Sequence, residues 1–106
     1  MTVEEVMRRG FPSYHRPLEL ARAWLREGET RRADALALLT QLRKKYPHVL
    51  AIGNEFVLAL LEKGDSGAAL EELSRLERQF RDIDEETRSR WGRMYKETGD
   101  RAWQSN

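Results

Sequence analysis

Three short stretches decide the fold class: residues 25–29 read LREGE, residues 61–65 read LEKGD, and residues 96–100 read KETGD. They recur at offsets of 36 (61 minus 25) and 35 (96 minus 61) residues. Glycine is the residue that most often follows the end of a helix, because it adopts left-handed backbone angles without strain. A repeat of about 20 to 50 residues indicates a helical solenoid. The sequence therefore predicts three similar units, in each of which a helix ends at glycine.

The composition narrows the class of protein. The chain has 106 residues, of which 40% are hydrophobic and 35% are charged, with 19 basic and 18 acidic side chains. It is too hydrophobic for obligate disorder and too balanced in charge to suggest a polyanion-binding protein. The absence of cysteine excludes disulfides, thiolate metal sites and a cysteine nucleophile. There is no apolar run of about 20 residues and no signal-peptide core, so we expect a cytoplasmic protein.

Start and stop signals predict the helices. Thr2 with Glu5, Thr30, Asp65 or Ser66, and Asp82 or Asp84 are the expected N-caps. The expected helices cover about 2–9, 13 or 16 to 27, 30–46, 49–63, 65–80 and 82–99. Because the connections are short, consecutive helices are expected to form antiparallel hairpins.

The repeated pattern resembles the tetratricopeptide repeat (TPR) family over residues 14–103. The matching positions, repeat by repeat, are Leu20-Ala21, Trp24, Gly28-Glu29 and Ala33; Phe56, Leu60, Gly64-Asp65 and Ala69; and Trp91-Gly92, Tyr95 and Gly99-Asp100. The small residues among them, which are Ala21, Ala33, Ala69 and Gly92, are expected to let helices approach closely. The chain departs from the family pattern at Val57, Thr40, Leu76 and Pro47.

The resemblance implies an all-α, right-handed α-solenoid of antiparallel helix hairpins, with about two and a half TPR-like repeats. Residues 1–13 would form a short N-terminal helix and cap, followed by a repeat domain over 14–106. The expected repeats are about 14–48, 49–83 and 84–106. Residues 91–97, WGRMYKE, are also similar, more weakly, to the TRAFs-binding-type TPR regions of signalling proteins.

The sequence offers no constellation of catalytic or ligand-binding residues. His15 and His48 lack a carboxylate or second histidine at ligand spacing, and the acidic run over 82–86 lacks the pattern of a calcium loop. None of the glycines belongs to a phosphate-binding Gly-Lys-Ser or Gly-Lys-Thr motif. We therefore expect no enzyme activity, no metal and no cofactor.

In the TPR family the first helix of each hairpin lines a concave groove that binds a partner protein or peptide. The positions that correspond to this groove include Arg22, Leu25, Arg26, Asn54, Leu58, Leu61, Glu62, Arg93 and Lys96. Cations beside leucines suit an acidic, amphipathic peptide or a carboxylate terminus. The lysine and asparagine of the family's chaperone-type clamp are replaced by Leu18 and Arg22, so a chaperone adaptor is not expected.

Two other functions remain open. The last hairpin lacks its second helix, so Trp91, Met94 and Trp103 are expected to be partly uncovered and to support self-association. The chain would then connect or oligomerise a signalling effector domain that lies outside it. A helical nucleic-acid-binding module is the second alternative, which the interleaved glutamates disfavour.

Overall fold

The computed structural model describes the backbone of residues 1–104 and the side chains of residues 1–97. Within that part of the chain there are six α-helices and no strand. The helices are α1 (Val3–Arg9), α2 (His15–Arg26), α3 (Glu29–Lys45), α4 (Leu50–Lys63), α5 (Ser66–Gln79) and α6 (Glu85–Gln104). The prediction of an all-α protein is confirmed.

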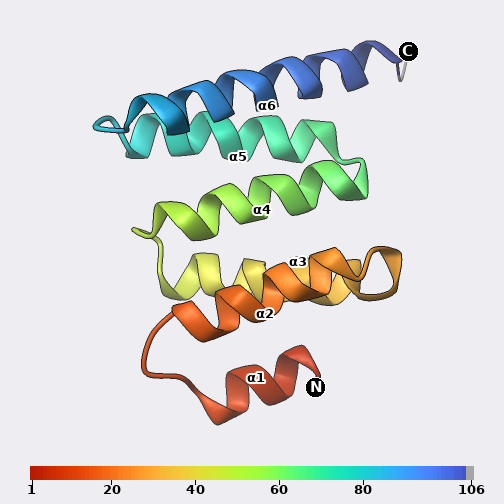
Figure 1. Ribbon diagram of the computed structural model, residues 1–106, viewed down its shortest axis with the longest axis vertical. Coiled ribbons are helices and arrows are strands. Elements are labelled where there is room, and N and C mark those ends of the chain that lie inside the picture. The colour runs from red at the N-terminus through yellow and green to blue at the C-terminus, as the bar shows by residue number, and fades with distance from the viewer. Residues whose placement is uncertain (105–106) are drawn as a thin grey trace.

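The helices are stacked in chain order, from α1 at one end of the molecule to α6 at the other (Figure 1). From α2 onward, consecutive helices run in opposite directions and each packs mainly on its neighbours in the chain. The short α1 is the exception, because it packs chiefly on α3. The molecule is elongated, with principal extents of 41, 33 and 19 Å.

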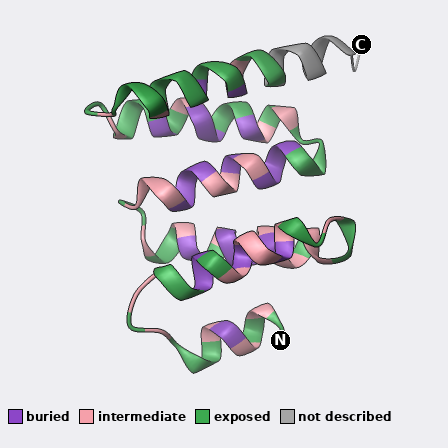
Figure 2. Ribbon diagram, in the orientation of Figure 1, coloured by how far each residue is buried: buried purple, intermediate pink, exposed green. Residues whose placement is uncertain are grey.

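Two clusters of buried side chains form the core. One includes Trp24 and Leu38 and joins α2 to α3, while the other includes Leu73 and Leu76 and joins α4, α5 and α6. Phe56, which is half-buried, packs against both clusters. Buried residues occur in all six helices, and in α4 they alternate with half-buried ones, so that the core follows the length of the stack (Figure 2).

Side-chain caps stabilise three helix N-termini, each on a predicted residue. The Thr2 hydroxyl accepts a hydrogen bond from the Glu5 amide at 3.1 Å, and the Asp65 carboxylate accepts one from the Ala68 amide at 3.1 Å. The Asp84 carboxylate accepts a bond from the Thr87 amide at 2.8 Å. Hydrogen bonds from the Thr87 side chain and then from its backbone lower the pKa of Asp84, because they favour the charged form.

Two helix boundaries differ from the predictions. Thr30 does not cap α3, which begins at Glu29 directly after Gly28. At Gly28 the backbone angle φ is 76°, so glycine makes the sharp turn between α2 and α3 and leaves no place for a threonine cap. Gly99 was expected to end the last helix, but it lies within α6, which continues to Gln104. A glycine inside a helix costs only about 1 kcal/mol, which does not require the helix to stop.

The four small residues of the TPR pattern do not all lie where helices pack together. Ala21 and Ala69 are buried as predicted, whereas Ala33 and Gly92 are exposed and do not bring helices together. Among the glycines, Gly53 lies closest to a side chain of another helix, and the TPR pattern did not single it out. A β-carbon built there would lie 2.5 Å from Cδ2 of the buried Leu76, so α4 and α5 meet at this point.

These environments predict opposite effects of alanine at two helical glycines. Gly53→Ala is expected to lower the free energy of unfolding by about 1 kcal/mol, because the cost of overpacking against Leu76 exceeds the gain in helix propensity. Gly92→Ala is expected to raise it by about 0.5 to 1 kcal/mol, since nothing lies within 4 Å of the added carbon. Urea unfolding followed by circular dichroism measures both. Stabilisation by Gly53→Ala would show that the two helices are not closely packed there.

Candidate functional site

A hollow between α2 and α4 brings together part of the predicted groove. It has a volume of about 260 Å³, and its lining consists of Arg22, Leu25, Arg26, Glu55, Leu58 and Glu62. Five of these six side chains, all except Glu55, were predicted as groove residues from the sequence. The two helices that bound the hollow, α2 and α4, are separated in the chain by α3.

The hollow is balanced in charge, which its predicted residues did not indicate. Arg22 donates hydrogen bonds to Glu55 at 2.9 Å and to Glu19 at 2.7 Å. Burial opposes the charge of Arg22, but the bonds to Glu55 and Glu19 outweigh it and raise the pKa of the guanidinium above its ordinary value. Two arginines therefore face two carboxylates, Glu55 and Glu62. Sequence analysis placed Glu62 at the groove but missed Glu55, because Arg22 and Glu55 are 33 residues apart and share no local pattern.

Two predicted groove residues are buried in the protein instead. Leu61 belongs to the core cluster of α4, α5 and α6. Asn54 is buried too, and its side-chain oxygen accepts a hydrogen bond of 2.7 Å from Nε1 of Trp91. These two side chains are used to hold helices together and do not line the hollow.

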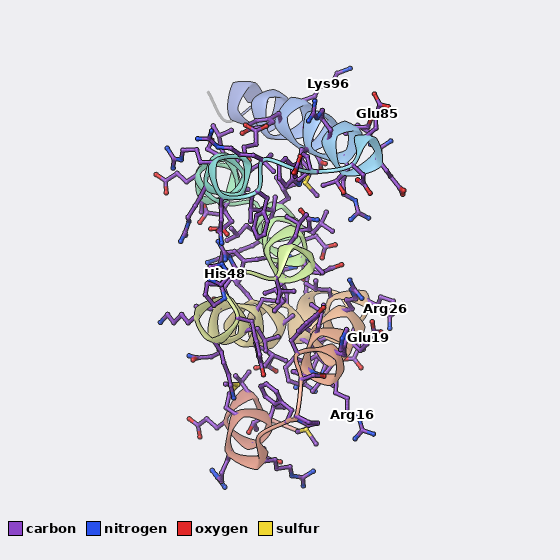
Figure 3. The ribbon with its side chains drawn as sticks, turned by 90° about the vertical axis from the view of Figure 1, so that its left-hand side faces the viewer. Arg16, Glu19, Arg26, His48, Glu85 and Lys96 are labelled. Carbon is purple, nitrogen blue, oxygen red and sulfur yellow. The ribbon has the colours of Figure 1, made fainter. Side chains whose placement is uncertain are left out.

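The remaining predicted cations are exposed on α6. Arg93 and Lys96 do not line the hollow between α2 and α4. Figure 3 shows Lys96 on α6 and Arg26 on α2, with α4 between these two helices. The four cations therefore do not form one cluster.

The residues expected at an uncovered C-terminal end are largely covered. Trp91 is 2% exposed and Met94 is 4% exposed, because both pack with Leu73 and Leu76 in the core cluster. Neither side chain can provide an exposed surface for self-association. The side chain of Trp103 lies outside the described residues.

A buried ionic cluster connects α3 to α5 and was also missed by sequence analysis. The Arg43 guanidinium contacts the Glu72 carboxylate at 2.6 Å, and Arg75 contacts the same carboxylate at 2.8 Å. The side chains of Arg43 and Glu72 are 10% and 3% exposed. The Gln79 amide donates a hydrogen bond of 2.7 Å to the carbonyl of Pro47 beside this cluster. Because Arg43, Glu72 and Arg75 all have partners within the chain, the cluster joins α3 to α5.

The described side chains do not form a metal site. His15 and His48 are exposed and lie on different parts of the molecule, at the start of α2 and in the turn after α3. No group of three or more potential ligands that could hold a metal ion occurs among residues 1–97. In the part of the chain that the structure describes, no helix combines the length and the hydrophobicity needed to cross a membrane.

Comparison of the chain with protein-family models, curated proteins and solved structures found no match. The chain's own residues therefore provide the basis for a functional proposal. Among the sequence-derived candidates, the hollow between α2 and α4 is where half-buried apolar side chains and charged side chains meet.

Proposed function

We propose that this chain is a non-catalytic protein-interaction module that binds a partner peptide or protein between α2 and α4. Its arrangement would be a TPR-like, right-handed α-solenoid, with α2 and α3 as one hairpin, α4 and α5 as the next, and α6 as the first helix of a third. The pairing of consecutive helices and the buried Ala21 and Ala69 support this arrangement.

The hollow between α2 and α4 is the observation that carries the proposal. Two half-buried leucines, Leu25 and Leu58, lie between charged side chains on both helices. Apolar anchors surrounded by polar groups are typical of grooves that bind peptides. Leu25 packs against the core cluster of α2 and α3 and Leu58 against that of α4, α5 and α6, while both also line the hollow.

The charged side chains of the hollow between α2 and α4 indicate which charges a partner would carry. Arg22 is already held by two glutamates, whereas Arg26 is exposed and has no ion pair among the described residues. Glu62 is likewise exposed on the opposite helix. A partner with one apolar anchor, flanked by a carboxylate toward Arg26 and a cation toward Glu62, would complement the hollow.

Site-specific photo-crosslinking tests this proposal. A photoreactive phenylalanine analogue placed at Leu58 is expected to capture one or a few proteins from a lysate, and an excess of unmodified protein should compete for them. The same analogue at Leu70 is the matched control, because Leu70 is 42% exposed on α5, outside the hollow. Recovery of the same proteins from both positions, or of none that is competed at Leu58, would contradict binding in the hollow.

A further inference from the structure

A second hollow lies on the other flank of α2 and is larger than the first. It has a volume of about 560 Å³ and is bounded by α1, by the turn that follows α1, and by α2. Its apolar wall includes Val6, Phe11, Pro17 and Leu20. A site of this size and character is within the range of natural binding sites, which are about 300 to 1,000 Å³.

Two residues that line this hollow, Met1 and Phe11, are held in place by residues that do not line it. At one end, Nη2 of Arg31 donates a hydrogen bond of 2.7 Å to the carbonyl of Met1. At the other end, the ring of Phe11 lies 6.2 Å from the ring of Tyr46, and Lys45 lies over Phe11. The residues before and after α1 are thus attached to α3 and to Tyr46, the residue that follows α3. As a result, α1 packs on α3 and leaves this flank of α2 uncovered.

Three arginines surround the apolar wall without a partner. Arg9, Arg16 and Arg26 line the hollow and are exposed, and none of them forms an ion pair among the described residues. The lining includes one carboxylate, Glu19, which is already bonded to Arg22. Figure 3 shows Arg16, Glu19 and Arg26 on the same side of the molecule, along α2. The hollow therefore combines an apolar wall with an excess of positive charge.

The positions of the arginines decide the class of ligand. Arg16 and Arg26 are ten residues apart on one helix, which corresponds to about 15 Å at 1.5 Å per residue. A small anion with a single charged group can contact only one of these two arginines. A helix of three turns that carries several carboxylates is long enough to contact both. We infer that the hollow between α1 and α2 binds an amphipathic helix of a partner protein, with its apolar stripe against Leu20 and its carboxylates toward the arginines.

The chain's own last helix is a poor occupant. Residues 88–96 of α6 carry four cations, Arg88, Arg90, Arg93 and Lys96, and no carboxylate, and the exposed Glu85, Glu86 and Glu97 lie on either side of this stretch. Like charges brought together at an interface oppose binding. Charge complementarity therefore favours an acidic partner helix over a second copy docked through α6.

A peptide-binding experiment tests this inference on the full chain. The probe is a synthetic helical peptide of about 14 residues with leucines at heptad spacing and glutamates on both flanks. The control peptide has a lysine in place of every glutamate. Fluorescence anisotropy is expected to show binding of the glutamate peptide, weakened by salt, and at least about tenfold weaker binding of the lysine peptide.

A pair of matched variants locates the peptide. Arg9→Glu with Arg16→Glu is expected to weaken binding at least about tenfold, whereas Arg78→Glu with Arg90→Glu changes the net charge equally and is expected to alter it less than about twofold. Methyl NMR signals of Val6 and Leu20 should shift on binding. Failure of the glutamate peptide to bind, or equal effects of the two variants, would overturn the inference. Shifts confined to Leu25 and Leu58 would also overturn it and would place the peptide between α2 and α4, so this test is separate from that of the proposed function.

Discussion

Replacing Glu72 with alanine is expected to lower the free energy of unfolding by about 3 to 5 kcal/mol, because it leaves the largely buried guanidinium of Arg43 with only the Pro47 carbonyl, at 3.3 Å, as a partner. Removing one partner of a buried ion pair costs more than the pair contributes, since the remaining charge loses both its partner and most of its water. Urea unfolding at neutral pH, followed by circular dichroism, measures the difference.

Two control variants separate this explanation from a general loss of packing. Arg43→Met together with Glu72→Leu removes both charges, and we expect its stability to lie within about 1 kcal/mol of the wild type. Arg75→Met removes only the outer partner, which is 63% exposed, so a loss below about 1 kcal/mol is expected. A loss of that small size for Glu72→Ala would show that Arg43 finds other partners or water.

The second large effect is expected at Trp91. Trp91→Ala should lower the free energy of unfolding by about 3 to 5 kcal/mol, because it removes a fully buried ring and leaves a cavity beneath α6. Trp91 also joins α6 to α4 through its hydrogen bond to Asn54. Hydrogen exchange should therefore become faster in α6 than in α2 and α3. Urea unfolding and amide exchange measured by NMR test the two expectations.

The contribution of the hydrogen bond is separable from that of the ring. Trp91→Phe retains much of the apolar volume but leaves the buried Asn54 oxygen unpaired. The unpaired oxygen is expected to lower the free energy of unfolding by about 1 to 3 kcal/mol, in addition to the smaller cost of the lost ring volume. Leu70→Ala on α5 serves as the reference, because Leu70 is exposed and its loss should change stability by less than about 0.5 kcal/mol. Equal stability of Trp91→Ala and Leu70→Ala would mean that α6 is not docked through Trp91.

The helices were predictable because their signals are local. Thr2, Asp65 and Asp84 cap the helices that follow them, and Gly64 adopts left-handed angles after α4, as their places in the sequence predicted. Each of these signals acts over three or four residues. The close contact at Gly53 depends on Leu76 from another helix, and no pattern within α4 indicates it.

The candidate site was predictable only as far as helical spacing determines it. Spacing places Leu25 and Arg26 on one helix and Leu58 on another, and the structure brings them together. Spacing does not show which polar groups are used internally. Asn54 accepts a hydrogen bond from Trp91, which is 37 residues away in the sequence, and Arg43 binds Glu72, which is 29 residues away. Such pairs are set by how the hairpins pack, which has no signature in either segment alone.

The order of the helices along the stack also has a kinetic consequence. Each helix from α2 to α6 finds its main packing partner in a helix adjacent to it in the chain, so the search for native contacts closes only short loops. Helical proteins dominated by such local contacts cross the folding barrier in about microseconds to milliseconds. The ion pair of Arg43 with Glu72 and the bond of Trp91 with Asn54 span longer separations, and they would form after the hairpins that carry them have met.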